Sequence, residues 1–188
     1  ANLAIAMCML GRRVMLLDAD LGLANVDVLL GLQPSHSLAD VVGGERRLQD
    51  IIVTGPAGVR VIPGASGLAE MANLTPAQHA GIIHAFSELT EDLDALLIDT
   101  AAGISDGVLR FCSAANEVLV VVCDEPTSIT DAYALIKVLS TEHNVSRFRI
   151  ITNMTHQGGD GRSLFEKLLR VSERFLQVTL DHAGSVPY

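Results

Sequence analysis

This sequence has few of the residues that small cross-linked folds and zinc sites need. Of its 188 residues, only three are cysteines (Cys8, Cys112 and Cys123), six are histidines, and none is tryptophan. An odd number of cysteines without Cys-x-x-Cys spacing does not suit a disulfide framework and favours a reducing cytoplasm. No two histidines stand four residues apart or in a zinc-finger spacing, so we do not expect a zinc site.

Positive charge and long apolar runs are also scarce. The chain has 13 Lys and Arg residues against 22 Asp and Glu residues, which gives a formal net charge of −9 at pH 7. Because binding to a phosphate backbone requires a basic field, we expect no direct contact with nucleic acid. No apolar run reaches the length of a membrane-spanning helix, and the first residues do not form a signal-peptide pattern.

Aliphatic residues dominate instead. The chain is 49% hydrophobic but only 4% aromatic, which is typical of parallel strands buried between helices. Strand and helix patterns alternate from Arg13 to Leu180. This alternation predicts an α/β fold, with a doubly wound, mostly parallel sheet and helices on both faces. We expect one domain over residues 1–188, truncated at both ends, because the chain starts inside a helical pattern and stops without a closing element.

The expected elements follow from the period of the apolar residues. Strands are predicted at residues 13–18, 59–62, 95–98, 117–123, 148–152 and 177–180. Helices are predicted at residues 3–10, 105–112, 128–139 and 162–175, with another opening at Thr75-Pro76 and short helical turns at 25–31 and 37–42. The strand at 117–123 has six consecutive apolar residues, which predicts burial on both faces at a central position.

Carboxylates follow two of these strands. Asp18 and Asp20 come after the apolar residues 14–17, and Asp99 comes after residues 95–98. Open α/β sheets bind ligands at the carboxyl ends of their strands, so we expect these side chains at the rim of a phosphate and magnesium site. Each carboxylate alone could instead cap the following turn. Two such edges in one chain favour the ligand site, and the small residues from Thr100 to Gly103 would let backbone approach a γ-phosphate.

Two other segments are weaker candidates. Asn153 follows the strand at 148–152 and could hydrogen-bond an adenine edge, or form an Asx turn at the strand end. Residues 158–161 (GGDG) precede a helix but lack the lysine and the spacing of a phosphate-binding loop, which favours a flexible loop. No GxGxxG motif follows any strand, which argues against a nicotinamide-dependent dehydrogenase.

Three segments together resemble one family, the MinD/ParA-type ATPases. Residues 18–31 (DADLGLANVDVLLG) resemble the switch I region of that family, and residues 97–104 (LIDTAAGI) resemble its Walker B and switch II. Residues 125–137 (EPTSITDAYALIK) are similar to the form found in flagellar-number regulators of the FleN/FlhG type. The resemblance covers essentially the whole chain, and the long segments indicate the flagellar branch.

The resemblance implies a cytoplasmic bacterial ATPase that forms a homodimer around two ATP molecules and Mg²⁺. Asp20 matches the aspartate that orients the attacking water, and Asp99 matches the Walker B aspartate that acts on magnesium, largely through water. Asn153 matches the residue that reads adenine, Pro187 lies in a closing loop near the base, and Glu125 matches a residue that reaches the partner's nucleotide. The remaining residues expected at the nucleotide are Asp18, Gly22, Asn25, Thr100 and Gly103.

The resemblance also implies partners. The ATP-bound dimer of this branch restrains a flagellar master transcription activator, and relatives meet a signal-recognition-like GTPase and flagellar switch components. We expect action in the cytoplasm, at the pole or peripheral to the inner membrane, with membrane contact only through a C-terminal segment beyond these residues. The alternatives are a partition or cell-division positioning ATPase, and a non-catalytic interaction module of the same fold.

One departure from the family pattern matters for activity. The phosphate loop KGGxGK[ST], which in the family lies just upstream of the helix in which this chain begins, is absent from these residues. They therefore lack its lysine for the β- and γ-phosphates and its Ser/Thr for magnesium. We expect that residues 1–188, expressed alone, neither fold well nor bind ATP. A KGGxGK[ST] loop ahead of Ala1 would favour the ATPase over the non-catalytic module.

Overall fold

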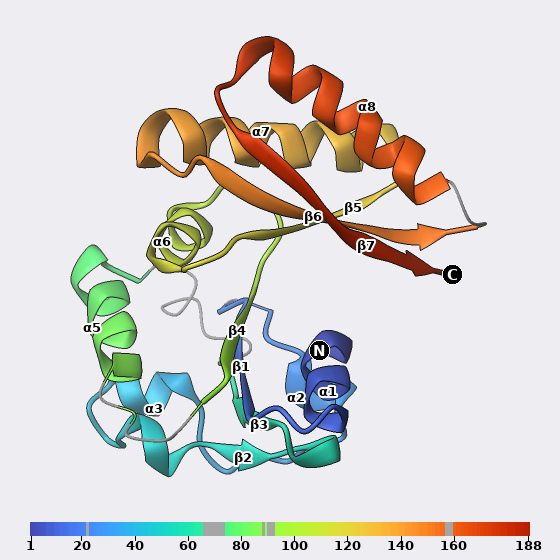
Figure 1. Ribbon diagram of the computed structural model, residues 1–188. Coiled ribbons are helices and arrows are strands. Elements are labelled where there is room, and N and C mark those ends of the chain that lie inside the picture. Colours follow the sequence, from blue (N-terminus) through green and yellow to red (C-terminus); the bar gives the residue numbers. More distant parts are fainter. Residues whose placement is uncertain (22, 66–73, 88, 90–92, 157–159) are drawn as a thin grey trace. The chain divides into compact units, whose positions relative to one another are not determined.

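A computed structural model describes residues 1–21, 23–65, 74–87, 89, 93–156 and 160–188 (Figure 1). The chain divides into two compact units, Ala1–Ala101 and Ala102–Tyr188, and each is described here by itself. Strands and helices alternate in both units, and all strand pairs but one are parallel among the described residues. The predicted α/β fold with a mostly parallel sheet is confirmed, whereas the single domain over residues 1–188 stays a prediction.

The first unit is built on a four-stranded sheet in the order β2-β3-β1-β4. β1 is parallel to β3 and β4, and β2 is antiparallel to β3. The strands are β1 (Val14–Ala19), β2 (Val53–Thr54), β3 (Arg60–Ile62) and β4 (Ala95–Thr100). The helices are α1 (Asn2–Met9), α2 (Val26–Leu29), α3 (Leu38–Val42) and α5 (Pro76–Ser87), with 3₁₀ turns η1 (Leu48–Asp50) and η2 (Pro56–Gly58).

Helices cover both faces of this sheet, which is why β1 carries buried apolar residues on both of its faces. Figure 1 shows α1 and α2 on one side of the sheet and α3 and α5 on the other. All six residues of β1 are buried, as expected of a strand that has neighbours on both edges and helices on both faces. One apolar cluster joins Ala4 of α1, Leu16 of β1, Val26 of α2 and Val61 of β3.

Local capping explains where two of these helices begin. The Ser37 Oγ accepts a hydrogen bond from the Ala39 amide, and the Asp40 carboxylate accepts one from the Ser37 amide, a capping box at the start of α3. Thr75 and Gln78 make the same reciprocal pair of bonds at the start of α5. The helix starts predicted at Ser37 and Thr75 are therefore confirmed.

The second unit contains a three-stranded parallel sheet in the order β5-β6-β7. Its strands are β5 (Leu119–Cys123), β6 (Arg147–Thr155) and β7 (Thr179–Pro187), and its helices are α6 (Asp106–Ala114), α7 (Pro126–His143) and α8 (Asp160–Phe175). Figure 1 shows α7 and α8 on one face of this sheet. The core between them includes Val120, Ile136, Phe148, Ile150 and Leu168.

The central, doubly buried position predicted for residues 117–123 is wrong. β5 is an edge strand of the second sheet, and only alternate residues are buried: Val120 and Val122 are in the core, whereas Val121 is 55% exposed. The alternation arises because α7 and α8 cover only one face of this strand. A run of β-branched residues satisfies both the apolar and the exposed positions of a strand, so the residue types alone did not reveal the alternation.

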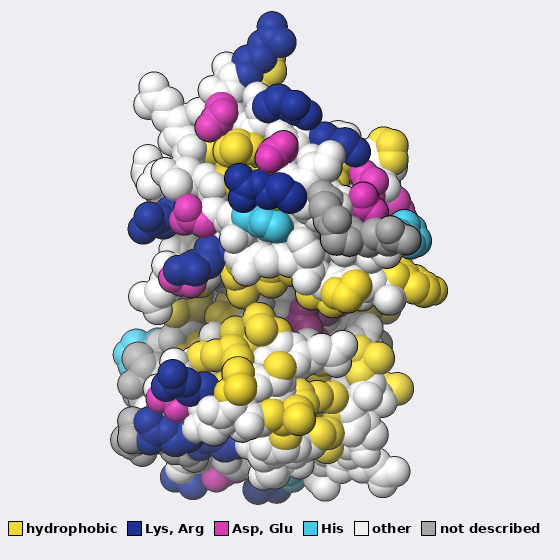
Figure 2. All heavy atoms as spheres, turned by 45° about the vertical axis from the view of Figure 1, so that its right-hand side comes forward, with side chains coloured by type: hydrophobic (Ala, Val, Ile, Leu, Met, Phe, Trp, Pro, Cys, Tyr) yellow, Lys and Arg dark blue, Asp and Glu magenta, His cyan; other side chains and the backbone are white. Residues whose placement is uncertain are grey.

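Exposed apolar side chains gather over α1 and α2. Leu3, Met9 and Leu10 come from α1 and the residue after it, and Val28 and Leu29 come from α2. Figure 2 shows hydrophobic side chains forming a broad patch on this part of the surface. In the part of the chain that the structure describes, no helix combines the length and the apolar character needed to span a membrane.

Candidate functional site

Two neighbouring parallel strands bring predicted carboxylates to one edge of the first sheet. In the β1–β4 pairing, Asp18 stands opposite Asp99, and Ala19 stands opposite Thr100. Burial raises the pKa of Asp18 most, and the negative charge of Asp99 adds to the rise. The two carboxylates, 81 positions apart in the sequence, are therefore close enough to interact at the carboxyl ends of the strands.

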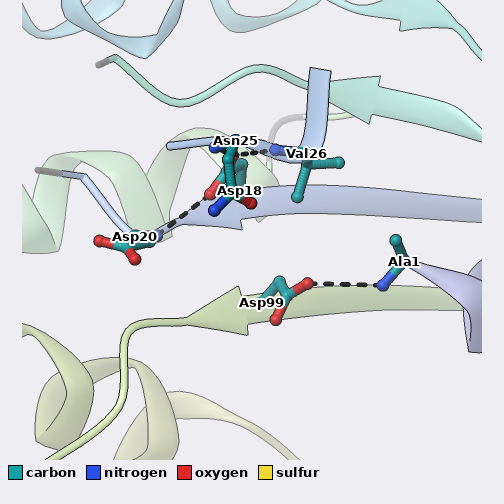
Figure 3. Close-up of polar contacts among 6 residues, drawn as sticks. All are labelled: Ala1, Asp18, Asp20, Asn25, Val26 and Asp99. Atoms are coloured by element: carbon teal, nitrogen blue, oxygen red, sulfur yellow. Dashed lines mark hydrogen bonds and ion pairs between the residues drawn. The ribbon is translucent and has the colours of Figure 1, made fainter. Parts of the chain in front are cut away.

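Asp18 is buried rather than standing at the open rim, which corrects the expectation from the sequence. It is 2% exposed. Its Oδ2 accepts hydrogen bonds from the amides of Asn25 at 2.8 Å and Val26 at 2.9 Å, and its Oδ1 accepts one from the Asp20 amide at 3.3 Å (Figure 3). β1 runs on through Ala19, and the chain then folds back so that the start of α2 covers the carboxylate. Asp18 thus caps α2, the alternative that the sequence left open, and its contact with a nucleotide stays a prediction.

Asp20 and Asp99 are more open. The Oδ1 of Asp20 accepts a hydrogen bond from the Leu23 amide at 3.3 Å, and Asp20 extends past the end of β1. The side chain of Asp99 is 50% exposed, and its Oδ2 lies 3.4 Å from the amino group of Ala1. Figure 3 shows Asp99 turned toward Ala1 and Asp20 lying beyond the end of β1. The two therefore share the edge of the sheet but point in different directions.

The carboxylates at this edge of the first sheet could bind Mg²⁺ only together with a nucleotide. The described residues contain no group of three or more His, Cys, Asp or Glu side chains that could hold a metal ion. Mg²⁺ prefers oxygen ligands, keeps several waters and commonly binds through one carboxylate and substrate phosphates. One exposed carboxylate, Asp99, therefore fits Mg²⁺ carried by a nucleotide, and does not fit an ion held by protein ligands alone.

The second unit gathers three predicted residues at the carboxyl ends of its strands. Asn153 stands opposite Cys123 of β5 and Val186 of β7, and Pro187 stands opposite Thr155. Glu125 is exposed and precedes the first residue of α7. Parallel pairing of the three strands thus places these residues at one edge.

Other predicted residues are placed less informatively. Asn25 is exposed, and its visible contribution is the backbone amide that binds Asp18. Thr100 is half-buried at the end of β4. Gly103 has φ +98°, a left-handed conformation that favours glycine in the turn before α6. Gly22 lies outside the described residues.

Sequence reasoning missed two residues that hold these edges together. A Cβ on Gly64 would lie 2.7 Å from the Ala24 Cβ and 2.8 Å from the Asp18 carbonyl oxygen, so only glycine lets this chain segment approach the Asp18 loop. The Ser128 Oγ accepts a hydrogen bond at 3.0 Å from the amide of Cys123, and so ties α7 to the end of β5. The Pro63-Gly64 pair after a strand was the signal in the sequence that could have indicated Gly64. No signal in the sequence indicated Ser128.

Comparison with known proteins places the chain in a family. A model of the family described as "AAA domain" matches residues 1–181. The protein Antiactivator FleN of Pseudomonas aeruginosa is 60% identical over 187 residues, which are 100% of this chain and 67% of that protein. The chain belongs to the MinD/ParA-type ATPases. The family predicted from residues 18–31, 97–104 and 125–137 is therefore confirmed.

Other members of the MinD/ParA-type ATPases agree with this placement. Flagellum site-determining protein YlxH of Helicobacter pylori is 33% identical over 99% of this chain, which spans 63% of that protein. The crystal structure of the cell division ATPase MinD of Pyrococcus furiosus is 26% identical, with a TM-score of 0.74 over 96% of this chain and 73% of that one. MinD of Pyrococcus horikoshii, complexed with Mg-ADP, has a TM-score of 0.75 at 23% identity, which shows the shared fold.

Proposed function

We propose that this chain is part of a MinD-like ATPase that binds ATP and Mg²⁺, dimerises, and restrains a flagellar transcription activator in the cytoplasm. ATP hydrolysis resets the dimer to the monomer and so acts as a timer. The observation that carries the ATPase part is the register of β1 and β4, which sets Asp18 and Asp99 side by side at the carboxyl ends of these strands. This is the arrangement expected of a phosphate and magnesium site at the carboxyl ends of parallel strands.

Three aspartates of the first unit have separate roles in this proposal. Asp18 fixes the segment that carries Asp20 by binding the amides on both sides of the loop. Asp20, beyond the end of β1, orients the attacking water and accepts a hydrogen bond from it. Asp99, with its exposed carboxylate, holds Mg²⁺ through water. When bound, ATP and Mg²⁺ supply the electrophilic phosphorus and neutralise charge at the phosphates.

The flagellar role is supported by sequence similarity. FleN, at 60% identity, is an antiactivator by name, and YlxH is a flagellum site-determining protein by name. MinD of Bacillus subtilis, a septum site-determining protein, is 29% identical over 96% of this chain. The higher identity to FleN favours restraint of an activator over positioning of a division septum.

The apolar surface over α1 and α2 supports self-association. It includes Leu10, Val28 and Leu29, each at least 70% exposed. Contiguous exposed apolar side chains mark surfaces that another protein covers. In the dimer we assign this surface to a second copy, and we assign to Glu125 a contact with the partner's nucleotide.

The experiment is Asp20→Ala in the intact protein, with Asp27→Ala as the matched control on α2. We expect Asp20→Ala to bind ATP, to hydrolyse it about 100-fold more slowly or worse, and to remain a dimer in ATP by light scattering. A strain that carries it should transcribe flagellar genes at a reduced level. Asp27, whose carboxylate bonds the neighbouring Val28 amide, should be replaceable without loss of turnover.

Each result bears on one part of the proposal. Normal hydrolysis by Asp20→Ala would give Asp20 another role. An intact protein that neither binds nor hydrolyses ATP would instead be a non-catalytic interaction module of the same fold. Normal flagellar transcription in a strain whose Asp20→Ala protein is locked as a dimer would remove the antiactivator role.

A further inference from the structure

A network of three polar side chains joins β6 and β7 near the carboxyl end of the second sheet. Thr152 is fully buried, and its hydroxyl donates to the Ser185 Oγ at 2.8 Å. The Nε2 of His182 lies 3.3 Å from the Thr152 Oγ1 and 3.5 Å from the Ser185 Oγ. Thr152 and Ser185 also stand opposite each other in the β6–β7 pairing. Three polar side chains therefore satisfy one another across two strands.

The first turn of α8 closes over this network. A Cβ on Gly161 would meet the Ser185 Oγ in a severe clash and would lie 2.6 Å from the Thr152 Oγ1, so only glycine fits there. The His182 ring stacks on Phe165 of the same helix, with ring centroids 5.0 Å apart. Gly161 is thus a packing requirement, in contrast to the flexible loop that residues 158–161 suggested; residues 158 and 159 lie outside the described residues.

The Thr152–Ser185 pair lies between two irregularities in the β6–β7 ladder. The register shifts between Ile150 and Ile151, where β7 has the extra residue Ala183, and again between Asn153 and Thr155, where β6 has the extra residue Met154. Met154 has φ +55°, a conformation that a residue with a side chain adopts at a cost, and its side chain is 47% exposed. Bulges of this kind re-aim neighbouring side chains and are common beside binding sites.

These features surround Asn153. It lies between buried Thr152 and strained Met154, and it stands opposite Val186, the residue before Pro187. The hydroxyl network holds the chain before Asn153, and the bulge holds it after Asn153. The backbone of Asn153 therefore has little freedom to move. The bulge sets the direction of the Asn153 side chain, and this would explain why the strained conformation of Met154 is kept.

We propose that Thr152, His182 and Ser185, together with the Met154 bulge, are positioning elements that hold Asn153 and the Val186–Pro187 backbone for recognition of a purine base. This inference rests on the proposed function, because it assigns residues of the second unit to recognition of the base of the nucleotide. The network touches no substrate; it acts through Asn153.

The test compares a ligand that has a base with one that lacks it. ATP and inorganic tripolyphosphate, each with Mg²⁺, are titrated into the intact protein and into the variants Thr152→Val, Thr152→Ser, Met154→Val and Met154→Gly. We expect Thr152→Val and Met154→Val to weaken ATP binding about tenfold, the order of one well-placed base contact, and to leave tripolyphosphate binding unchanged. The value of kcat at saturating ATP should stay constant while KM rises.

Two substitutions act as rescues and one as a control. Thr152→Ser keeps the hydroxyl, and Met154→Gly accepts the positive φ without strain, so both should bind ATP as the wild type does. Ser172→Ala removes another fully buried hydroxyl of this unit, on α8, and should leave both affinities unchanged.

The remaining outcomes overturn the inference. Equal weakening of ATP and tripolyphosphate would mean that the network has only a general structural role. Unchanged ATP affinity in both Thr152→Val and Met154→Val would show that Asn153 does not depend on these residues. Failure of the wild-type protein to bind ATP would refute the proposed function itself, and is distinguished from the other two by the wild-type titration.

Discussion

The two aspartates of the DAD sequence should have separable effects, because Asp18 and Asp20 make very different contacts. Asp18 is buried and accepts three backbone hydrogen bonds, two of them at 2.8 and 2.9 Å. Asp20 accepts a hydrogen bond at 3.3 Å from the Leu23 amide in an exposed setting. We therefore predict that Asp18→Ala destabilises the protein, whereas Asp20→Ala does not.

The size of the effect follows from the bonds that are lost. A hydrogen bond to a charged group contributes about 1.5–3 kcal/mol, and a buried amide left without a partner costs about 1–3 kcal/mol. Removing the Asp18 carboxylate also removes a buried charge whose raised pKa reports a cost of ionisation in the folded state. Because these effects oppose each other, we expect a net loss of about 2–4 kcal/mol for Asp18→Ala. A surface substitution such as Asp20→Ala should stay within about 0.5 kcal/mol.

Urea unfolding of the intact protein, followed by far-ultraviolet circular dichroism, measures the difference. With a slope of about 2 kcal/mol per molar urea, the midpoint of Asp18→Ala should fall by about 1–2 M, and that of Asp20→Ala should not move measurably. Asp18→Asn should lie between them, because its amide keeps one acceptor oxygen but presents a donor to a backbone amide. Equal midpoints for Asp18→Ala and Asp20→Ala would refute the conclusion that Asp18 holds the start of α2.

Three further predictions use the same intact protein. Gly64→Ala should lower the free energy of unfolding by about 1–3 kcal/mol, because its Cβ would meet the Asp18 backbone. Gly81→Ala in α5, where a Cβ would find open space, should raise it by about 0.5–1 kcal/mol. The midpoints of thermal unfolding of the two variants should therefore shift in opposite directions. Ser172→Ala should raise the free energy of unfolding by about 1 kcal/mol, since its buried hydroxyl has no hydrogen-bond partner among the described residues, and a loss measured in urea would contradict this. The Ser37 amide holds the pKa of Asp40 below its ordinary value of 3.8, so the stability that ionised Asp40 contributes is present above that value and is lost as the pH falls through the folded pKa. The stability difference between the wild type and Asp40→Asn should accordingly shrink when unfolding is measured at progressively lower pH, and a constant difference would exclude this role.

The secondary structure could be predicted largely because its signals are local. The start of α3 at Ser37 and that of α5 at Thr75 follow from capping residues within four positions of each other. β1 could be predicted from the four consecutive apolar residues Val14 to Leu17, because a strand covered on both faces is apolar on both. β5 showed the limit: its valines fit an exposed position as well as a buried one.

The site was predictable only in its outline. Acidic residues after two strands indicated the edge at which Asp18 and Asp99 meet, because parallel pairing brings carboxyl ends together. Which carboxylate is buried depends on how the chain returns over β1, and that depends on the close approach of Gly64, which is far from the motif in the sequence. The Met154 bulge was equally hidden, since a bulge depends on the register of two strands and not on the residue that adopts it.

β2 has a consequence for how copies of this protein can associate. It has two residues, it ends the first sheet beyond β3, and Gly55 and Pro56 follow it directly. A strand this short offers few free amide and carbonyl groups, and proline supplies no donor to extend the ladder. Backbone pairing between copies, as in fibrils, is therefore disfavoured at that edge of the first unit. Association there has to use contacts between side chains, which can form and dissociate reversibly.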